Sequence, residues 1–421
     1  MESIKIGVCG WGNVATGLFK AIKDNKNEIN TNSGTDIEIK VIGARRDNPK
    51  CDPGNIKIER DIFKVLDHDI DVIVELIGGV ETAKDLILRA IKSKKHVITA
   101  NKAVIYHHGD EIFNEADRNK VKVLYESSVC AGTPIIKLLK EELAANKISK
   151  ISGMLNGTSN FILSNMEDGA DFDSTLSFAQ KQGYAEPDPT FDIEGLDAAH
   201  KIGILSALAY GTPLPPEEFF IEGISNIDNS DFKYAMEMGY TIKHLAVAAI
   251  KKDKIELRAH PVLVDLKSYL ANLKGVRNGI EIDTDLLGTL HIAGSGAGQE
   301  ATASGIISDI VHLANSNSNN SDKKDLNKKY NLSSFKNLIF QYYFYIEAED
   351  IPGVMASITS IFAKKNIGIE SIVQKENLDK NLVPIILITD AFLEKEHLDL
   401  LTKILELESV NKVRSIRIEP S

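Results

Sequence analysis

The sequence is poor in cysteine, the residue that holds many small secreted proteins and zinc sites together. It has only three cysteines in 421 residues, Cys9, Cys51 and Cys130. The number is odd and the spacing is wide, so neither a disulfide framework nor a zinc site is indicated. Scarce cysteine fits a reducing compartment, and we therefore expect a cytoplasmic protein.

Long apolar runs and an excess of positive charge are also missing. No stretch approaches the roughly 20 apolar residues that a membrane-spanning helix needs. The first residues form a strand-like stretch at 4–8, without the pattern of a signal peptide. Lys and Arg number 49 against 60 Asp and Glu, a net charge of −11, which argues against nucleic acid as a partner. We expect no membrane and no nucleic-acid partner.

The first 126 residues alternate short apolar runs with longer amphipathic stretches. This alternation predicts right-handed βαβ units around a parallel sheet, an α/β domain of the Rossmann type. The expected strands are 4–9, 37–42, 71–77, 97–100 and 121–125, and helices are expected at 81–93 and 103–119.

The pattern in the middle of the chain changes and predicts a second, α+β region. Helices are expected at 134–145, 174–182, 196–210 and 234–249, and strands at 148–155, 255–264 and 279–284. The small-residue motif Gly294-Ser295-Gly296-Ala297-Gly298 is then expected to open one more helix at 302–314.

The end of the chain is separated by a polar stretch. Residues 315–329 are mostly Asn, Ser, Asp and Lys and lack the apolar surface to pack, which indicates a linker. Beyond it, the order strand, helix, strand, strand, helix, strand predicts a ferredoxin-like βαββαβ fold. The predicted domains are 1–133 with 298–314 returning to it, 134–297, the linker 315–336, and 337–421.

A glycine-rich turn follows the first strand and opens a helix, in the segment Gly10-Trp11-Gly12-Asn13-Val14-Ala15. In that context Gly10 permits the tight turn, Gly12 lets the backbone approach a pyrophosphate, and a small Ala15 lets helix meet strand. The helix start at Asn13 and Val14 offers N–H groups and a positive dipole end to phosphates. We therefore expect a nicotinamide dinucleotide cofactor.

The end of the second strand bears on which dinucleotide is used. An acidic residue there would hold the ribose hydroxyls of NAD, but the chain has Gly43-Ala44-Arg45-Arg46. Arg45 and Arg46 could accept a 2′-phosphate, which favours NADP over NAD. The alternative is that both arginines are solvated loop charges.

Two lysines and a group of carboxylates carry the expected chemistry. Lys102, in Ala100-Asn101-Lys102, follows the fifth strand and should point into the crevice at the carboxyl end of the sheet. Asp197 and Lys201 are four residues apart and share one helix face, beside apolar neighbours that predict burial. A surface ion pair is the plain alternative, but a buried lysine near carboxylates is often functional.

At this point the sequence resembles homoserine dehydrogenase. The resemblance rests on several long motifs in order over about residues 4–312: Ala100–Ala103, Gly153-Met154-Leu155-Asn156-Gly157-Thr158-Ser159-Asn160, Gly183-Tyr184-Ala185-Glu186-Pro187-Asp188-Pro189, Gly195-Leu196-Asp197-Ala198-Ala199-His200-Lys201 and Gly294–Gly298. It implies reversible reduction of L-aspartate 4-semialdehyde to L-homoserine by NAD(P)H, in threonine, methionine and isoleucine biosynthesis.

The resemblance implies that region 134–297 is the catalytic, substrate-binding and dimerisation domain, and it also assigns roles to residues. Lys201 is implied as the acid/base residue and Lys102 as its assistant near the substrate oxygen and the nicotinamide. Two cations beside a developing alkoxide suit that chemistry. The residues implied for substrate binding are Glu186, Asp192, Asp197, Asn156, Gly157 and Thr158. Gly298 is implied on the cofactor side.

A monovalent cation, Na⁺ or K⁺, is implied near the hinge by the same resemblance. Its implied ligands are Glu126, Val129, Ala131 and Thr133, and oxygen-rich backbone suits such a hard ion. The sequence departs from the family pattern at Cys130-Ala131-Gly132, where many members have a run of glycines, and at Glu300, where proline is frequent. The first departure puts the cation geometry in doubt.

The C-terminal region resembles an ACT domain. Such domains bind amino acids at paired interfaces, and the motifs Asp350-Ile351-Pro352-Gly353-Val354 and Asn366-Ile367-Gly368-Ile369 carry the resemblance. The implied effector site comprises Asp350, Gly353, Val354, Asn366 and Ile367, with L-threonine as the candidate effector. A domain kept only for dimerisation is the alternative. A homo-oligomer, dimer or tetramer, is expected.

Two other functions fit parts of the sequence. An aspartate-semialdehyde dehydrogenase would need a cysteine nucleophile with a histidine base, for which Cys130 is the one plausible candidate. A non-catalytic amino-acid sensor that kept the fold is the other, and the presence of Lys102 and Lys201 argues against it.

Overall fold

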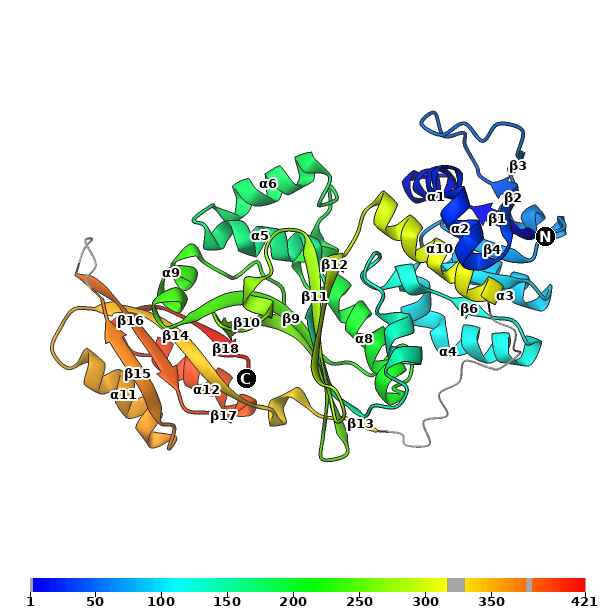
Figure 1. Ribbon diagram of the computed structural model, residues 1–421. Coiled ribbons are helices and arrows are strands. Elements are labelled where there is room, and N and C mark those ends of the chain that lie inside the picture. Colours follow the sequence, from blue (N-terminus) through cyan, green and yellow to red (C-terminus); the bar gives the residue numbers. More distant parts are fainter. Residues whose placement is uncertain (1–2, 316–329, 376–380, 421) are drawn as a thin grey trace. The chain divides into compact units, whose positions relative to one another are not determined.

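The computed structural model describes residues 3–315, 330–375 and 381–420 (Figure 1). By contact, the chain divides into two compact units. The first contains Met1–Ile151, Ala199–Glu218 and Arg277–Tyr330, and the second contains Ser152–Ala198, Phe219–Val276 and Asn331–Ser421. Compact units and family domains divide a chain in different ways, so the domain boundaries given above stay predictions.

The first unit is built on a six-stranded sheet in the order β3-β2-β1-β4-β5-β6. All five neighbouring pairs are parallel, which is the strand order of dinucleotide-binding folds. The predicted Rossmann-type sheet is therefore confirmed. The strands are β1 (Ser3–Cys9), β2 (Asp36–Gly43), β3 (Lys57–Glu59), β4 (Val72–Glu75), β5 (His96–Thr99) and β6 (Val123–Leu124).

Helices cover this sheet and close its core. They are α1 (Asn13–Asp24), α2 (Lys26–Ser33), α3 (Glu81–Lys92), α4 (Lys102–Asn119) and, from far along the chain, α10 (Gln299–Asn315). Helix α10 lies beside α1 and adds Ala303, Ile306 and Ile310 to the core of the sheet (Figure 1). The same unit contains the antiparallel hairpin of β11 (Arg277–Thr284) and β12 (Gly288–Ser295).

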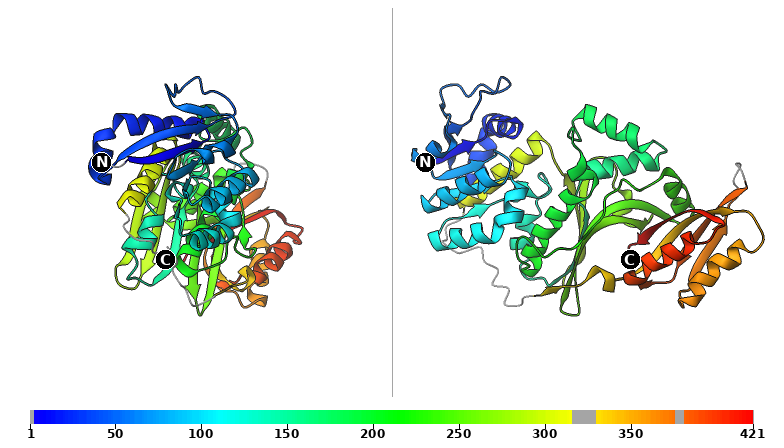
Figure 2. Two further views of the ribbon diagram at one scale, coloured as in Figure 1. Left: turned by 90° about the vertical axis from the view of Figure 1, so that its right-hand side faces the viewer. Right: turned by 180° about the vertical axis from the view of Figure 1, so that it is seen from behind.

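The second unit contains the ferredoxin-like part. Strands β14 (Ile339–Glu349), β15 (Ile369–Gln374), β16 (Leu382–Thr389) and β18 (Val410–Ile418) form an antiparallel sheet in the order β18-β14-β16-β15. Helices α11 (Val354–Lys364) and α12 (Glu394–Leu405) lie on one face of it (Figures 1 and 2). The predicted βαββαβ order is confirmed, with a short added strand β17 (Phe392–Leu393).

This sheet is continuous with the rest of the second unit. Strands β9 (Tyr240–Lys251) and β10 (Lys254–Asp265) form a long antiparallel hairpin, and β10 pairs in parallel with β18. The face opposite α11 and α12 packs on residues of α5 (Gly157–Glu167) and α9 (Asn229–Glu237). The second unit also contains α6 (Phe172–Gln182), α7 (Thr190–Ile193) and β8 (Phe220–Ile221). Strand β7 (Ile148–Met154) and helix α8 (Leu196–Tyr210) are each divided between the two units.

The helix expected at 234–249 is wrong. Helix α9 ends at Glu237, Gly239 has a φ of +87°, and the chain continues as strand β9. Residues 241–249 are all buried, so the strand has no exposed face, and from Leu245 to Ala249 both faces are apolar and show no two-residue period. An apolar run buried on both faces cannot be told from a buried helix by its periodicity.

The structure differs from two further expectations. The helix expected at 134–145 is shorter, with α-helical backbone at 136–137 that continues as a π-helical turn at Leu138–Glu142. Of the predicted linker 315–336, residues 316–329 lie outside the described residues. Its last part is ordered, because Asn331–Leu332 forms strand β13 along β10 and Phe335 stacks on Phe220 with ring centroids 3.7 Å apart.

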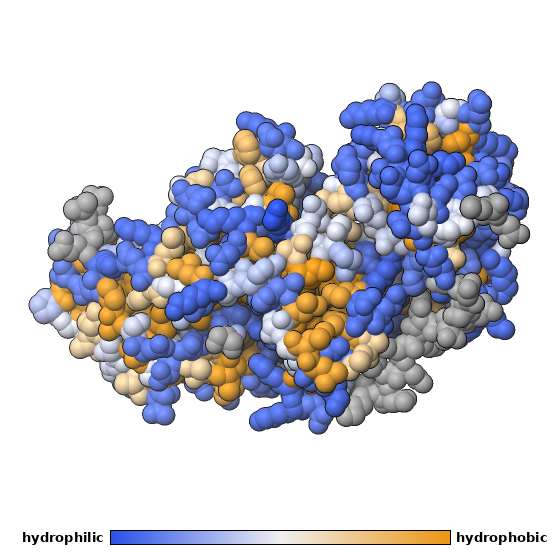
Figure 3. All heavy atoms as spheres, in the orientation of Figure 1, coloured by the Kyte–Doolittle hydropathy of each residue, from blue (hydrophilic) through white to orange (hydrophobic). Residues whose placement is uncertain are grey.

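None of the described helices is long and apolar enough to cross a membrane. Within the same described ranges, no group of three or more His, Cys, Asp or Glu side chains could hold a metal ion. The face drawn in Figure 3 is mostly hydrophilic, with apolar side chains in smaller groups.

Candidate active site

The glycine-rich turn lies between β1 and α1, as expected for a phosphate-binding turn. Gly10 has a φ of +102°, and a Cβ there would lie 2.5 Å from the Leu76 carbonyl oxygen, so only glycine fits. A Cβ at Gly12 would meet nothing within 4 Å, which leaves that backbone open to a ligand. Helix α1 starts at Asn13 without a side-chain cap, so its first N–H groups face outward.

The loop after β2 lies beside this turn. The Gly10 N–H donates to the Gly43 carbonyl at 2.8 Å, and Asn48 Nδ2 donates to Thr16 Oγ1 of α1 at 2.9 Å. Arg45 and Arg46, between those anchors, are exposed. The two arginines are therefore placed on the same edge of the sheet as the phosphate turn.

Lys102 follows β5, at the same carboxyl edge of the sheet as the phosphate turn. It is the first residue of α4, after Asn101, whose side-chain oxygen accepts the Val104 N–H at 3.2 Å as the helix cap. Lys102 is half-buried. The start of α4 therefore presents a lysine at the carboxyl end of β5, where ligands bind in such sheets.

Asn156 joins two of the predicted carboxylates. Its Nδ2 donates to Asp192 Oδ1 and to Asp197 Oδ2, both at 2.8 Å, and its Oδ1 accepts the Ser159 N–H at 2.7 Å as the cap of α5. Asn156 and Asp197 are each 5% exposed. Two carboxylates drawn to one amide leave a concentration of negative charge that suits an ammonium group.

The other predicted substrate residues belong to the surroundings of this cluster. The Thr158 hydroxyl donates to the Tyr184 carbonyl at 2.7 Å, which ties the start of α5 to the acidic loop. A Cβ at Gly157 would lie 2.8 Å from the Val276 carbonyl oxygen, so a side chain there would push two segments apart. Glu186 is exposed on its loop, and the structure brings it into no described contact with the Asn156 cluster.

Helix α8 carries Asp197 and Lys201 on one face. Lys201 is 8% exposed and its neighbours Ala198, Ala199 and Ile202 are fully buried, so the expected burial is confirmed. His244 packs against the turn before the helix, because a Cβ at Gly195 would lie 2.8 Å from its Nε2. Burial lowers the pKa of His244 to about 4, which keeps this ring neutral.

The proposed cation ligands form one short buried segment. Both Glu126 carboxylate oxygens accept backbone N–H groups, from Ile136 at 2.8 Å and Lys137 at 2.9 Å. The backbone at Ala131 is left-handed (φ +33°), which turns the loop sharply. The buried Thr133 hydroxyl has no hydrogen-bond partner among the described residues. A carboxylate, backbone turns and an unsatisfied hydroxyl fit a hard monovalent cation.

The ACT residues are less enclosed. Gly353 has a φ of +97° and caps the start of α11 without a side-chain hydrogen bond, and Asn366 has a φ of +55°. Val354 and Ile367 are buried, and Asp350 Oδ1 accepts the Gln374 amide at 3.1 Å. The two loops therefore present backbone groups beside buried apolar side chains.

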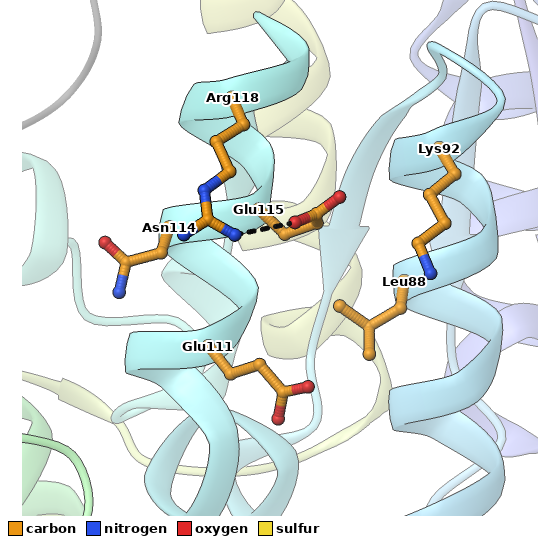
Figure 4. A pocket seen from close by; sticks show the side chains of 6 residues that line it. All are labelled: Leu88, Lys92, Glu111, Asn114, Glu115 and Arg118. Atoms are coloured by element: carbon orange, nitrogen blue, oxygen red, sulfur yellow. Dashed lines mark hydrogen bonds and ion pairs between the residues drawn. The ribbon is translucent and has the colours of Figure 1, made fainter.

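A surface pocket of about 320 Å³ lies between α3 and α4 in the first unit. Figure 4 shows its walls, with Leu88 and Lys92 from α3 and the rest from α4. Its acids are already paired, Glu115 with Arg118 at 3.4 Å and Glu111 with Lys84 at 2.8 Å. The pocket contains none of the predicted site residues.

One residue of this site was missed from the sequence. Glu75 ends β4, is 0% exposed and accepts the Thr99 hydroxyl and the Ile77 N–H. Its signal was a carboxylate directly after the apolar run 72–74, at the carboxyl edge of the expected sheet.

The parallel sheet with its glycine-rich turn, the strand-end lysine and the buried helix with a second lysine define an NAD(P)-dependent oxidoreductase. Family models agree: the homoserine dehydrogenase NAD-binding domain matches residues 10–126, homoserine dehydrogenase matches 134–311, and the ACT domain matches 342–406. The chain belongs to the homoserine dehydrogenase family and acts on a CH–OH group.

Known relatives resemble the chain along its length. It is 42% identical to the homoserine dehydrogenase of Pseudomonas aeruginosa, over 100% of this chain and 99% of that protein. A crystal structure of a homoserine dehydrogenase from Thiobacillus denitrificans is similar with a TM-score of 0.92 and 41% identity, covering 99% and 98%. A hyperthermophilic archaeal homoserine dehydrogenase in complex with NADPH matches with a TM-score of 0.62 and 27% identity, covering 74% and 97%.

Proposed function

We propose that the chain catalyses the reversible reduction of L-aspartate 4-semialdehyde to L-homoserine. The observation that carries this proposal is the Asp192–Asn156–Asp197 cluster at the start of the helix that bears Lys201. An amino acid with a hydroxyl at C4 places its ammonium on the carboxylates and its oxygen toward a lysine.

The residues divide the work as follows. Asp192, Asp197 and Glu186 hold the substrate ammonium, with Asn156 keeping the first two together and Gly157 and Thr158 shaping the wall. Lys201 takes the hydroxyl proton when homoserine is oxidised and returns it in the reduction, while the Lys102 cation stabilises the developing negative oxygen. A bound nicotinamide accepts or supplies the hydride.

The cofactor is proposed to be NADP, with NAD as the alternative. Gly10, Gly12, Asn13 and Val14 offer the phosphate turn, with Gly298 on the cofactor side. Arg45 and Arg46 are exposed after β2 with no carboxylate before them, which suits a 2′-phosphate. The relative solved with NADPH supports this preference.

A monovalent cation and an amino-acid effector complete the proposal. Glu126, Val129, Ala131 and Thr133 would hold Na⁺ or K⁺, which orders the segment after β6. L-threonine would bind around Asp350, Gly353, Val354, Asn366 and Ile367 in the ACT domain, where the uncapped start of α11 suits its carboxylate. We further propose a cytoplasmic homo-oligomer, dimer or tetramer, acting in threonine, methionine and isoleucine biosynthesis.

The reaction is tested by absorbance at 340 nm with L-homoserine and either NADP or NAD, in the presence of Na⁺ or K⁺. Cofactor reduction that Lys201→Ala removes supports both the reaction and the acid/base role. A matched control is Lys243→Ala, since Lys243 is also buried but bonds to the Leu273 carbonyl at 3.2 Å. No reduction with either cofactor would contradict the proposal, and faster turnover with NAD would contradict the cofactor preference.

The effector is tested separately. Millimolar threonine should change the rate of the wild-type protein, and Gly353→Asp, which puts a carboxylate at the start of α11, should remove that change. Absence of both a change in rate and binding by calorimetry would favour a domain kept only for dimerisation.

The aspartate-semialdehyde dehydrogenase alternative is not supported. Cys130 is 1% exposed and its Sγ accepts the Asn278 amide at 3.2 Å, so it is poorly placed as a nucleophile. Iodoacetamide should leave activity unchanged, and substrate-protected inactivation would revive the alternative.

A further inference from the structure

Glu75 is a fully buried carboxylate at the carboxyl end of β4, and the proposed chemistry does not use it. Burying a carboxyl group costs free energy unless its oxygens are well bonded. Burial raises the pKa of Glu75, and the hydrogen bond from Thr99 opposes that rise. The hydrogen bonds that Glu75 accepts must therefore offset the free energy of burying its carboxyl group at the end of an apolar strand.

The carboxylate joins the two loops that follow neighbouring strands. One oxygen accepts the Ile77 N–H at 2.8 Å, in the loop after β4. The other accepts the Thr99 hydroxyl at 2.6 Å, at the end of β5, and Thr99 is 0% exposed. Both bonds lie within the first unit and at the edge of the sheet where the cofactor turn lies.

The first loop contacts the phosphate turn. The Leu76 N–H donates to the Cys9 carbonyl at 2.7 Å, and the Leu76 carbonyl oxygen is the atom that excludes a side chain at Gly10. The loop then turns through Gly78 and Gly79 with φ values of +70° and +72°. Its position therefore defines one wall of the glycine-rich turn.

The second loop leads to Lys102. Thr99 Oγ1 accepts the Asn101 N–H at 3.0 Å, and Asn101 Nδ2 reaches back to the Gly79 carbonyl at 2.6 Å. The same Asn101 caps helix α4, and Lys102 is the next residue. Glu75, Thr99 and Asn101 thus close a ring of hydrogen bonds between the two loops.

We infer that Glu75 and Thr99 are positioning residues that fix the position of Lys102 relative to the glycine-rich turn. The inference rests on the proposed role of Lys102. It assigns no contact with substrate to either residue. Because reaction rate depends steeply on the placement of the reacting groups, loss of this ring should reduce kcat and leave ground-state binding nearly unchanged.

The test compares Thr99→Val, which removes the hydroxyl at nearly constant volume, with Thr99→Ser, which keeps it. We expect Thr99→Val to lower kcat about tenfold or more, with the KM for homoserine and the Kd of NADPH changing less than about threefold. Thr99→Ser should keep kcat within about threefold of wild type, and Glu75→Gln should behave like Thr99→Val.

Ser33→Ala is the matched control. Its hydroxyl is also buried and donates to the Thr35 carbonyl at 2.8 Å, but it precedes β2, at the opposite edge of the same sheet. It should leave kcat unchanged. Hydrogen–deuterium exchange of the peptides 76–80 and 99–104 should rise in Thr99→Val and stay unchanged in Ser33→Ala.

The exchange measurement needs no turnover, so it separates this inference from the proposed function. Absence of homoserine oxidation by the wild-type protein would refute the proposed function alone. Unchanged exchange in both peptides, an unchanged kcat in Thr99→Val, or a loss of kcat that Thr99→Ser shares would each overturn the positioning role.

Discussion

Replacing Asn156 by aspartate is a direct test of the carboxylate cluster. The wild-type amide donates both hydrogens to Asp192 and Asp197 and accepts the Ser159 N–H with its oxygen. Asn156→Asp keeps the shape and the acceptor that caps α5, but it replaces the donor by a third negative oxygen. The N-cap of α5, which stabilises a helix by about 1 kcal/mol, is therefore preserved.

The magnitude follows from the bonds lost. A hydrogen bond to a charged group contributes about 1.5–3 kcal/mol, and Asn156 makes two of them. Water at the half-buried Asp192 compensates for part of that loss. We expect about 3 kcal/mol against kcat/KM for homoserine, on the order of a 100-fold decrease, since each tenfold corresponds to about 1.36 kcal/mol.

The assay is the initial rate of cofactor reduction across homoserine concentrations, with thermal unfolding measured in parallel. Asn160→Asp is the control, because Asn160 lies on the same helix, is 3% exposed, and donates its amide to the Gly275 carbonyl at 2.8 Å. It should lose stability but keep kcat/KM within about threefold. A kcat/KM of Asn156→Asp near wild type, or an equal loss in both variants, would refute the reasoning.

Three other predictions concern stability and cofactor binding. Burial depresses the pKa of His244 from 6.5 to about 4, so between these pH values the unfolded state holds a proton that the folded state lacks. The free energy of unfolding should therefore decrease by about 3 kcal/mol as the pH is lowered from above 6.5 to below 4. His244→Gln, which can still donate a hydrogen bond, should flatten that slope in denaturant titrations, and an unchanged slope would contradict it. Arg417→Met should cost about 3–5 kcal/mol in free energy of unfolding, because it strands the buried Glu394 that Arg417 bonds at 2.8 and 2.9 Å. The double variant Arg417→Met/Glu394→Gln should recover part of the lost free energy of unfolding. If the losses of the two single variants simply add in the double variant, the ion pair does not explain the cost. Gly12→Ala should fold normally but weaken NADPH binding about tenfold or more in fluorescence titrations, whereas Gly10→Ala should lower the melting temperature itself. Equal NADPH affinities for Gly12→Ala and wild type would place the phosphates elsewhere.

Local sequence predicted the elements whose signal is local. The parallel sheet, the glycine-rich turn and helix α8 are read from alternation, turn residues and apolar spacing, and each is present where it was expected. Strand β9 was mistaken for helix because its partners on both faces come from distant segments, which a single run of residues does not reveal.

The candidate site shows the same limit. The resemblance placed Asn156 near the substrate, but its part as a bridge between Asp192 and Asp197 depends on a contact across 36 and 41 residues. Glu75 was missed because its partner Thr99 belongs to the next strand. Residue type and spacing can identify candidate catalytic and binding residues. The residues that position them are found only from the tertiary contacts between loops.

The ACT sheet is joined to the substrate residues by bonded contacts within the second unit. Arg417 of β18 donates from Nη1 to Glu222 at 2.8 Å, and the Glu222 carbonyl accepts the His244 ring at 3.0 Å. The next residues close on the turn before α8, since the Ile224 N–H donates to the Ile193 carbonyl at 2.8 Å. That turn separates Asp192 from Asp197. An amino acid that shifts β18 would therefore act on the spacing of the two carboxylates proposed to hold the substrate, which predicts an effect on homoserine KM more than on cofactor binding.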